Sequence, residues 1–242
     1  MNMNLSKVLG VCSVLGMLAV PALLANTVSI GNSWGPYQTG SGGEFTLNLG
    51  EGMDGSGSSY NYSTAYAATT KGQLNNGLPN IQTFCVEGGW YPESATAGRS
   101  YGVTLGSETK NTGRTLTLGA AYLYYNFAMG TLDGYDYGSG RTTSAGLLQN
   151  ALWSLMGEAS APSGNTFYNA AIANGNALTA NNGTYAVQVM NLWDAGKTSG
   201  TGYQDMLVLA APQNSVPDGG LTVGMLGMAL AGLATAGRKL RK

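Results

Sequence analysis

Apolar and polar side chains alternate with a period of two in several short stretches of this 242-residue chain. That spacing is typical of a β-strand with one buried face. Loops rich in glycine and serine separate the stretches, as at residues 51–59. Alternation predicts strands at residues 44–49 and 60–68, and further strands are predicted at residues 81–87, 101–105, 185–192 and 204–209.

A helical spacing occupies the middle of the chain. Residues 116–129 place a set of apolar side chains on one helical face: Ala120, Leu123, Tyr124 and Phe127. A second helix is predicted from a cap at Thr142 or Thr143 to about Gly157, and a third over residues 166–178. Strands, then helices, then strands predict an α+β fold, with an antiparallel sheet or a small β-barrel and a few inserted helices.

The first 25 residues have the composition of a signal peptide. Lys7 supplies a positive start, residues 8–24 are almost wholly apolar, and Ala25 offers a small side chain before the cut. These flanks are typical of a cleaved secretory leader rather than of a permanent membrane span. We therefore expect residues 1–25 to be removed on export, so that the mature chain begins at Asn26.

Residues 216–242 contain three parts in a fixed order. A turn-rich hinge comes first and consists of Val216, Pro217, Asp218, Gly219 and Gly220. An uncharged apolar run follows at residues 221–237, near the lower limit of about 17–25 residues for a transmembrane helix. The chain ends in a basic cluster that includes Arg238, Lys239, Arg241 and Lys242. Because such clusters stay cytoplasmic, the body of the protein, residues 26–215, is expected outside the membrane.

The hinge, apolar helix and basic end resemble the PEP-CTERM class of sorting signals, in the variant that begins Val-Pro-Asp. The resemblance covers residues 216–242. It implies a membrane-embedded exosortase that cuts near the hinge and passes the protein to the cell surface or the extracellular matrix. A plain C-terminal anchor helix is the alternative, since an apolar run with basic flanks is all that an anchor requires.

Charge and composition of the body exclude several functions. Residues 26–215 have the size of one domain, and their six basic and eleven acidic side chains leave a net charge near −5, which argues against nucleic acid as a partner. The chain contains no histidine, so a Ser-His-Asp triad, a Cys-His dyad and a histidine-ligated zinc are excluded. No paired carboxylates have an obvious role. We therefore expect no enzyme, no cofactor and no metal.

Two short segments combine into a candidate site. Residues 84–87, Phe-Cys-Val-Glu, lie on a predicted strand, and Cys85 is the one cysteine left in the mature chain, so it has no internal disulfide partner. Gln149 lies on a predicted helix, on the same face as Ala145, Leu152 and Trp153. A buried amide without hydrogen bonds costs about 1–3 kcal/mol, so Gln149 needs a partner inside the protein.

These segments resemble the two halves of the thioester domain of Gram-positive surface adhesins. In that family a strand carries an aromatic residue and cysteine, and a later helix carries Thr-Gln-X-Ala, usually followed by an aliphatic residue and Trp. Gln149, Ala151 and the Leu-Trp that follows match, whereas Leu148 stands where the family has threonine. The resemblance implies an internal thioester between the Cys85 sulfur and the Gln149 side-chain carbonyl, formed with loss of ammonia.

A thioester stores an acyl electrophile and lasts only where water is kept away. An amine on a target, such as a lysine, would attack the Gln149 carbonyl with the Cys85 thiolate as leaving group. The product would be an amide bond between this protein and the target. Glu87 or Tyr91 could move a proton. The residues expected to form or support the pocket are Phe84, Glu87, Trp90, Tyr91, Ala151 and Trp153.

Three alternatives remain. Because Leu148 replaces threonine, the domain could share the fold without the bond and bind its target non-covalently. The loop with Asp133, Asp136 and Gly138 could hold calcium through oxygen ligands, although its spacing is not that of an EF-hand and a solvated loop is the preferred interpretation. A group of tyrosines could stack on carbohydrate, but packing in the core and at its rim is preferred.

Overall fold

A computed structural model describes residues 27–30, 35, 37–39, 42–50, 80–89, 99–200 and 202–209. The predicted signal peptide, the predicted strand at 60–68, the pocket residues Trp90 and Tyr91, and the sorting signal at 216–242 lie outside the described residues. In the described part of the chain, no helix is long and apolar enough to cross a membrane.

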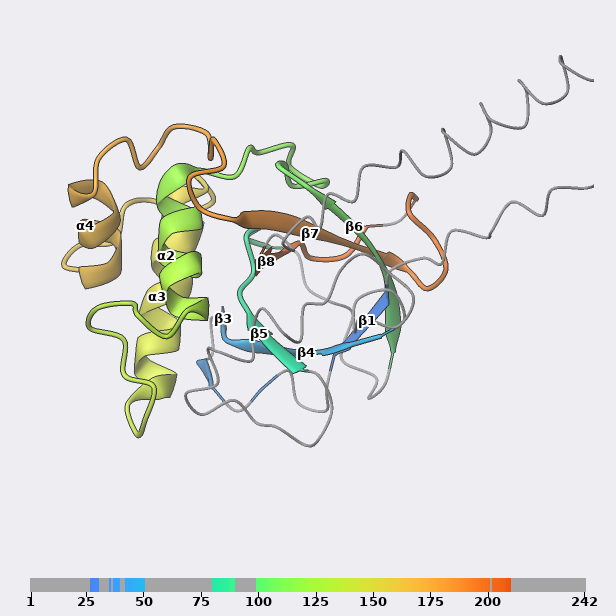
Figure 1. Cartoon of the computed structure of the whole chain (residues 1–242), viewed down its shortest axis with the longest axis horizontal. Coiled ribbons are helices and arrows are strands. Elements are labelled where there is room, and N and C mark those ends of the chain that lie inside the picture. The colour runs from blue at the N-terminus through green and yellow to red at the C-terminus, as the bar shows by residue number, and fades with distance from the viewer. Residues whose placement is uncertain are drawn as a thin grey trace, which may run out of the picture.

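Six antiparallel strands form one strongly curved sheet (Figure 1). Its order is β5-β4-β1-β6-β7-β8. The strands are β1 (Thr27–Ile30), β4 (Phe45–Leu49), β5 (Asn80–Thr83), β6 (Ser100–Gly106), β7 (Val187–Asp194) and β8 (Met206–Leu209). A separate two-stranded ribbon pairs β2 (Gln38–Thr39) with β3 (Gly42–Gly43). The predicted α+β class with an antiparallel, barrel-like sheet is confirmed.

The two edges of this sheet meet through the segment that follows β5. Cys85 forms a bridge with Met206 of β8, flanked by hydrogen bonds from Val86 N to Asp205 O (3.0 Å) and from Leu207 N to Phe84 O (3.1 Å). The barrel is thereby nearly closed. In such a pair the flanking residues make the ladder bonds, so the N–H and C=O of Cys85 point away from β8.

Three helices pack together beside the barrel (Figure 1). They are α2 (Leu118–Ala128), α3 (Arg141–Leu155) and α4 (Thr166–Ala173). The caps of α2 and α4 are side chains, because Thr117 accepts from Ala120 N and Asn165 accepts from Tyr168 N. All three predicted helices are present. Helices α2 and α4 are shorter than predicted, whereas α3 begins and ends earlier than predicted.

The predicted threonine cap of the second helix is wrong. Helix α3 begins at Arg141, and its cap residue Gly140 makes no side-chain hydrogen bond. The carboxylate of Asp136 instead accepts the backbone N–H groups of Gly138 (2.7 Å) and Gly140 (2.9 Å). An acidic side chain thus satisfies N–H groups just before the helix, where its charge also favours the helix dipole.

The core lies inside the barrel and between the barrel and the helices. The sheet contributes the fully buried side chains of Leu47, Ile81 and Val189 to this core. The helices contribute those of Leu123 and Leu152. Each such side chain contributes about 1.5–3 kcal/mol relative to an exposed position. Strand β1 was not predicted, because only Val28 and Ile30 are buried on its core face and two positions give too short an alternation.

Candidate functional site

Cys85 and Gln149 are brought together from distant parts of the sequence. Cys85 closes the barrel after β5, and Gln149 lies in the middle of α3. Both side chains are about 1% exposed. The inward orientation that helical spacing predicts for Gln149 is therefore present in the structure.

The side-chain amide of Gln149 pairs with both backbone groups of Cys85. The Cys85 N–H donates to Gln149 Oε1 (3.2 Å), and Gln149 Nε2 donates to the Cys85 carbonyl (2.8 Å). These backbone groups face away from β8, so the amide takes the place of a missing neighbouring strand. The geometry sets the acyl carbon of Gln149 opposite the Cα that bears the thiol.

Gly42 and Trp153 cover this amide. A Cβ added at Gly42, where φ is +126°, would lie 2.9 Å from Gln149 Cγ, 3.5 Å from its Cδ and 3.2 Å from Trp153 Cη2. Glycine is needed here because any side chain would collide with the glutamine. Gly42 and Trp153 are half-buried whereas Gln149 is buried, so the acyl group lies directly beneath the surface at the β2–β3 ribbon.

The other motif residues form the packing around the pair. Phe84 is fully buried and meets the Phe127 ring edge-on, with 4.9 Å between centroids. Ala151 and Leu148 are also fully buried. Leu148, which replaces the threonine of the adhesin motif, thus belongs to the hydrophobic core. The indole N–H of Trp153 is buried and has no hydrogen-bond partner within the described ranges.

The thiol of Cys85 is held in its neutral form. Burial raises the pKa of Cys85 well above its usual range, and the negative charge of Glu87 raises it further. A buried neutral thiol is a poor nucleophile compared with a thiolate. A proton must therefore leave the sulfur when it attacks an acyl group, and return to it when it departs.

The arrangement contains the parts of an acyl-transfer site. Cys85 supplies a sulfur, Gln149 supplies an acyl carbon, and the Cys85 N–H donates to the oxygen on which negative charge would develop. A preorganised backbone donor of this kind stabilises a tetrahedral intermediate. The same two hydrogen bonds also fit a purely structural role, because they satisfy buried polar groups.

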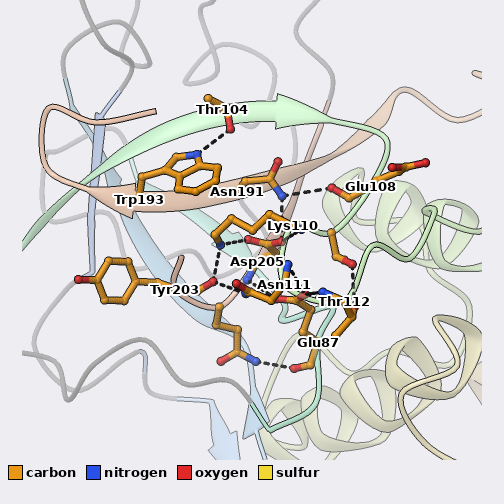
Figure 2. A network of polar contacts seen from close by, with 12 residues as sticks. Glu87, Thr104, Glu108, Lys110, Asn111, Thr112, Asn191, Trp193, Tyr203 and Asp205 are labelled. Carbon is orange, nitrogen blue, oxygen red and sulfur yellow. Dashed lines mark hydrogen bonds and ion pairs between the residues drawn. The ribbon is translucent and has the colours of Figure 1, made fainter. Parts of the chain in front are cut away.

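Glu87 was expected to support the pocket around Cys85 and Gln149, but its carboxylate makes its hydrogen bonds elsewhere. Its buried carboxylate accepts the backbone N–H of Thr112 (3.0 Å) and the side-chain amide of Asn111 (2.6 Å), as Figure 2 shows. The structure places it among polar residues beside β8. Its influence on Cys85 is through its charge.

The calcium and carbohydrate alternatives gain no support. Asp136 uses both carboxylate oxygens on backbone N–H groups of its own loop. The described residues contain no group of three acidic or cysteine side chains that could hold a metal ion. Tyr124 and Tyr135 are buried, and Tyr137 stacks on Phe127 with 5.9 Å between ring centroids. Packing explains these rings.

Sequence reasoning missed a buried ion pair that connects the barrel to α3. Arg141, the first residue of α3, donates from Nε to Glu44 Oε1 (2.7 Å) and from its terminal nitrogen to Oε2 (2.8 Å), and Tyr135 donates to Oε1 (2.5 Å). The guanidinium also lies 4.3 Å from the centre of the Tyr37 ring. Both charged side chains are almost fully buried. Charged residues are sparse in this chain, and that sparseness is the signal in the sequence that could have drawn attention to Glu44 and Arg141.

The site and the fold were compared with known proteins. The chain shows no significant match to any family model, to any curated protein or to any solved structure. The structure therefore defines the class of this protein by geometry alone: a barrel-like α+β domain with a buried cysteine–glutamine pair.

Proposed function

We propose that this protein is exported, sorted at the cell envelope by an exosortase, and joined covalently to amines on a target through an internal Cys85–Gln149 thioester. The observation that carries the proposal is the Gln149 amide, which is held against Cys85 in a buried position. The cysteine and the glutamine are the two groups that the adhesin resemblance requires.

Formation of the bond needs no cofactor. The Cys85 sulfur attacks Gln149 Cδ, the thiol proton passes to Nε2, and that nitrogen leaves as ammonia. Cys85 N–H can keep its bond to Oε1 throughout. The two hydrogen bonds hold the Gln149 amide against the Cys85 backbone, which replaces a bimolecular encounter. Such intramolecular placement is worth up to about 10⁵–10⁸ M in effective concentration.

The second step transfers the acyl group to the target. An amine attacks Cδ from the side covered by Gly42, the C–S bond breaks, and an amine proton moves to the sulfur. The raised pKa of Cys85 favours return of that proton, because the buried thiolate is disfavoured. The products are an amide to the target and a free Cys85 thiol, so each molecule reacts once.

Export and sorting agree with where the described elements lie. The sheet begins with β1 at Thr27 and ends with β8 at Leu209. Loss of residues 1–25 and cleavage near residues 216–220 would leave every described strand and helix in place. We propose the cell surface or the extracellular matrix as the location, with the C-terminal helix in the membrane before processing.

Intact mass spectrometry of the exported protein tests the thioester. The thioester should lower the mass by one ammonia relative to the same protein with Cys85 and Gln149 unreacted, with no thiol available to iodoacetamide. Incubation with methylamine should add one methylamine and release one thiol at Cys85. The variant Cys85→Ser is the matched control and should show no loss of ammonia. A native protein that shows no loss of ammonia, and whose cysteine is alkylated after unfolding without any amine treatment, would overturn the proposal.

A non-covalent module is the second candidate, and one observation favours it. The Gln149 amide already satisfies both backbone groups of Cys85, which is sufficient reason for a buried glutamine at this position. In that case Cys85→Ala should leave target binding and surface retention unchanged. Loss of retention in a variant that is folded would reject this candidate and support the covalent one.

A further inference from the structure

A second site lies beside β8, built from Lys110, Asp205 and Glu87 (Figure 2). Lys110 lies in the turn after β6, Asp205 directly precedes β8, and Glu87 follows the Cys85 bridge. The side chains of Lys110 and Asp205 are 9% and 0% exposed, and Glu87 is fully buried. The thioester proposal uses neither Lys110 nor Asp205.

The amine of Lys110 is in direct contact with the carboxyl group of Asp205. Lys110 Nζ contacts Asp205 Oδ1 and also donates to the Tyr203 carbonyl. Asp205 Oδ2 accepts the Lys110 backbone N–H (2.6 Å) and Asn191 Nδ2 (2.9 Å). One oxygen therefore faces the amine, while the other is held by two N–H donors.

The surrounding residues fix this geometry. The Lys110 amine lies 5.2 Å from the centre of the Trp193 ring. Glycine at position 202 leaves room for the lysine, because an added Cβ would lie 3.0 Å from Lys110 Cδ and still closer to the next carbon. Glu87 holds the turn that carries Lys110 by accepting the N–H groups of Asn111 (3.2 Å) and Thr112 (3.0 Å). The amine thus has little freedom to leave the carboxyl group.

We propose that Lys110 and Asp205 condense after folding into an intramolecular isopeptide bond. One proton crosses from the ammonium to Oδ1, which leaves a neutral amine and a neutral carboxylic acid. Nζ attacks Cγ, and the N–H groups of Lys110 and Asn191 stabilise the charge that develops on Oδ2. A second proton moves from Nζ to Oδ1, and the Cγ–Oδ1 bond breaks to release water. The product is an amide, with no change in net charge.

Burial makes this reaction favourable. In water, an ammonium and a carboxylate are each stabilised by hydration, whereas both lose that hydration here. Burial raises the pKa of Asp205, Lys110 opposes this shift, and the charge of Glu87 adds to it, so that the net direction favours the neutral acid. Contact between the groups supplies an effective concentration of up to about 10⁵–10⁸ M.

The bond would join the turn after β6 to the start of β8, across β7, which lies between them in the sheet. Asp205 is adjacent to Met206, the bridge partner of Cys85. An isopeptide bond would therefore lock the strand that closes the barrel at the Cys85–Gln149 pair. Its formation does not require the thioester.

Tryptic digestion followed by tandem mass spectrometry tests the bond. The expected result is a branched peptide that joins the segment with Lys110 to the segment with Asp205, lighter than their sum by one water, together with absent cleavage after Lys110. Hydroxylamine should leave this branched peptide intact, although it opens a thioester. Separate linear peptides with cleavage after Lys110, in protein shown to be folded, would overturn the proposal.

Two controls make the result specific. Lys110→Arg keeps a cation beside Asp205 but cannot condense, so its intact mass should lack the loss of water and its peptides should be linear. Lys197 and Asp194 form an ion pair in which the lysine is 62% exposed. Trypsin should therefore cleave after Lys197 without loss of water. An uncleaved peptide lighter by one water, at equal abundance, would mean that the linkage at Lys110 arises during sample handling.

Discussion

The Cα of Gly42 lies directly over the side chain of Gln149, so closely that a single methyl group cannot be added without collision. We expect Gly42→Ala to displace the glutamine from Cys85. Two effects should lower the unfolding free energy. Alanine at a φ of +126° costs about 1–3 kcal/mol, and overpacking against Gln149 costs about 1–3 kcal/mol more. The fraction of protein that lacks the mass of one ammonia should fall as well. Intact mass and chemical denaturation measure the two effects.

Gly200→Ala is the matched control for that substitution. Gly200 has a φ of +106° but nothing within 4 Å of an added Cβ. It should therefore show the backbone cost alone and leave the loss of ammonia unchanged. Equal effects of the two variants would contradict a role for Gly42 at the glutamine.

Gln149→Ala and Cys85→Ser separate the hydrogen bonds from the thioester. The alanine removes the amide that satisfies two buried backbone groups, and each such group costs about 1–3 kcal/mol when left unpaired. The serine keeps both bonds and removes only the sulfur. We expect Gln149→Ala to lower the denaturant midpoint by much more than Cys85→Ser, while both variants prevent the loss of ammonia. A larger loss for the serine variant would contradict the hydrogen-bond account.

The Glu44–Arg141 pair should behave as a buried ion pair. Glu44→Gln leaves the guanidinium buried without its full counter-charge, so we expect a loss of about 3–5 kcal/mol in unfolding free energy. Replacing both residues together, Glu44→Leu with Arg141→Met, should recover much of that loss. Urea denaturation measures all three proteins. Lys197→Ala, which breaks an exposed pair, serves as the control and should leave the urea midpoint nearly unchanged.

Once Cys85 is free, after methylamine treatment, its reactivity should depend on pH in a characteristic way. Its pKa in the folded protein is raised by burial and by Glu87, above the value of about 8.5 for an unfolded cysteine. Alkylation of the folded protein should still accelerate at a pH where the unfolded protein has levelled off. The neutral thiol contributes stability that is complete below about pH 8.5 and is lost as the pH rises toward the folded value. Alkylation rates at several pH values, folded and in urea, check this; superimposable profiles would contradict it.

Local pattern was sufficient for most of the elements. The alternation of residues 101–105, the apolar run at the end of residues 204–209 and the helical spacing around Tyr124 were each visible in the sequence. The inward face of Gln149 followed from the same rule. Two features were missed. Strand β1 is too short to be recognised, because it has only two buried alternating positions. The start of α3 depends on tertiary contacts, since the Glu44–Arg141 pair and the Asp136 carboxylate fix where this helix begins.

By itself, the sequence determined the class of fold, the absence of histidine chemistry and the two residue types that a thioester needs. Only the tertiary structure decided that Cys85 meets Gln149, that Gly42 covers the amide, and that Lys110 contacts Asp205. Periodicity reports which face of an element is buried, but not which distant element it faces. Those pairings depend on how the barrel closes at Cys85 and Met206 and on where α3 is fixed against it, and both are properties of the assembled chain.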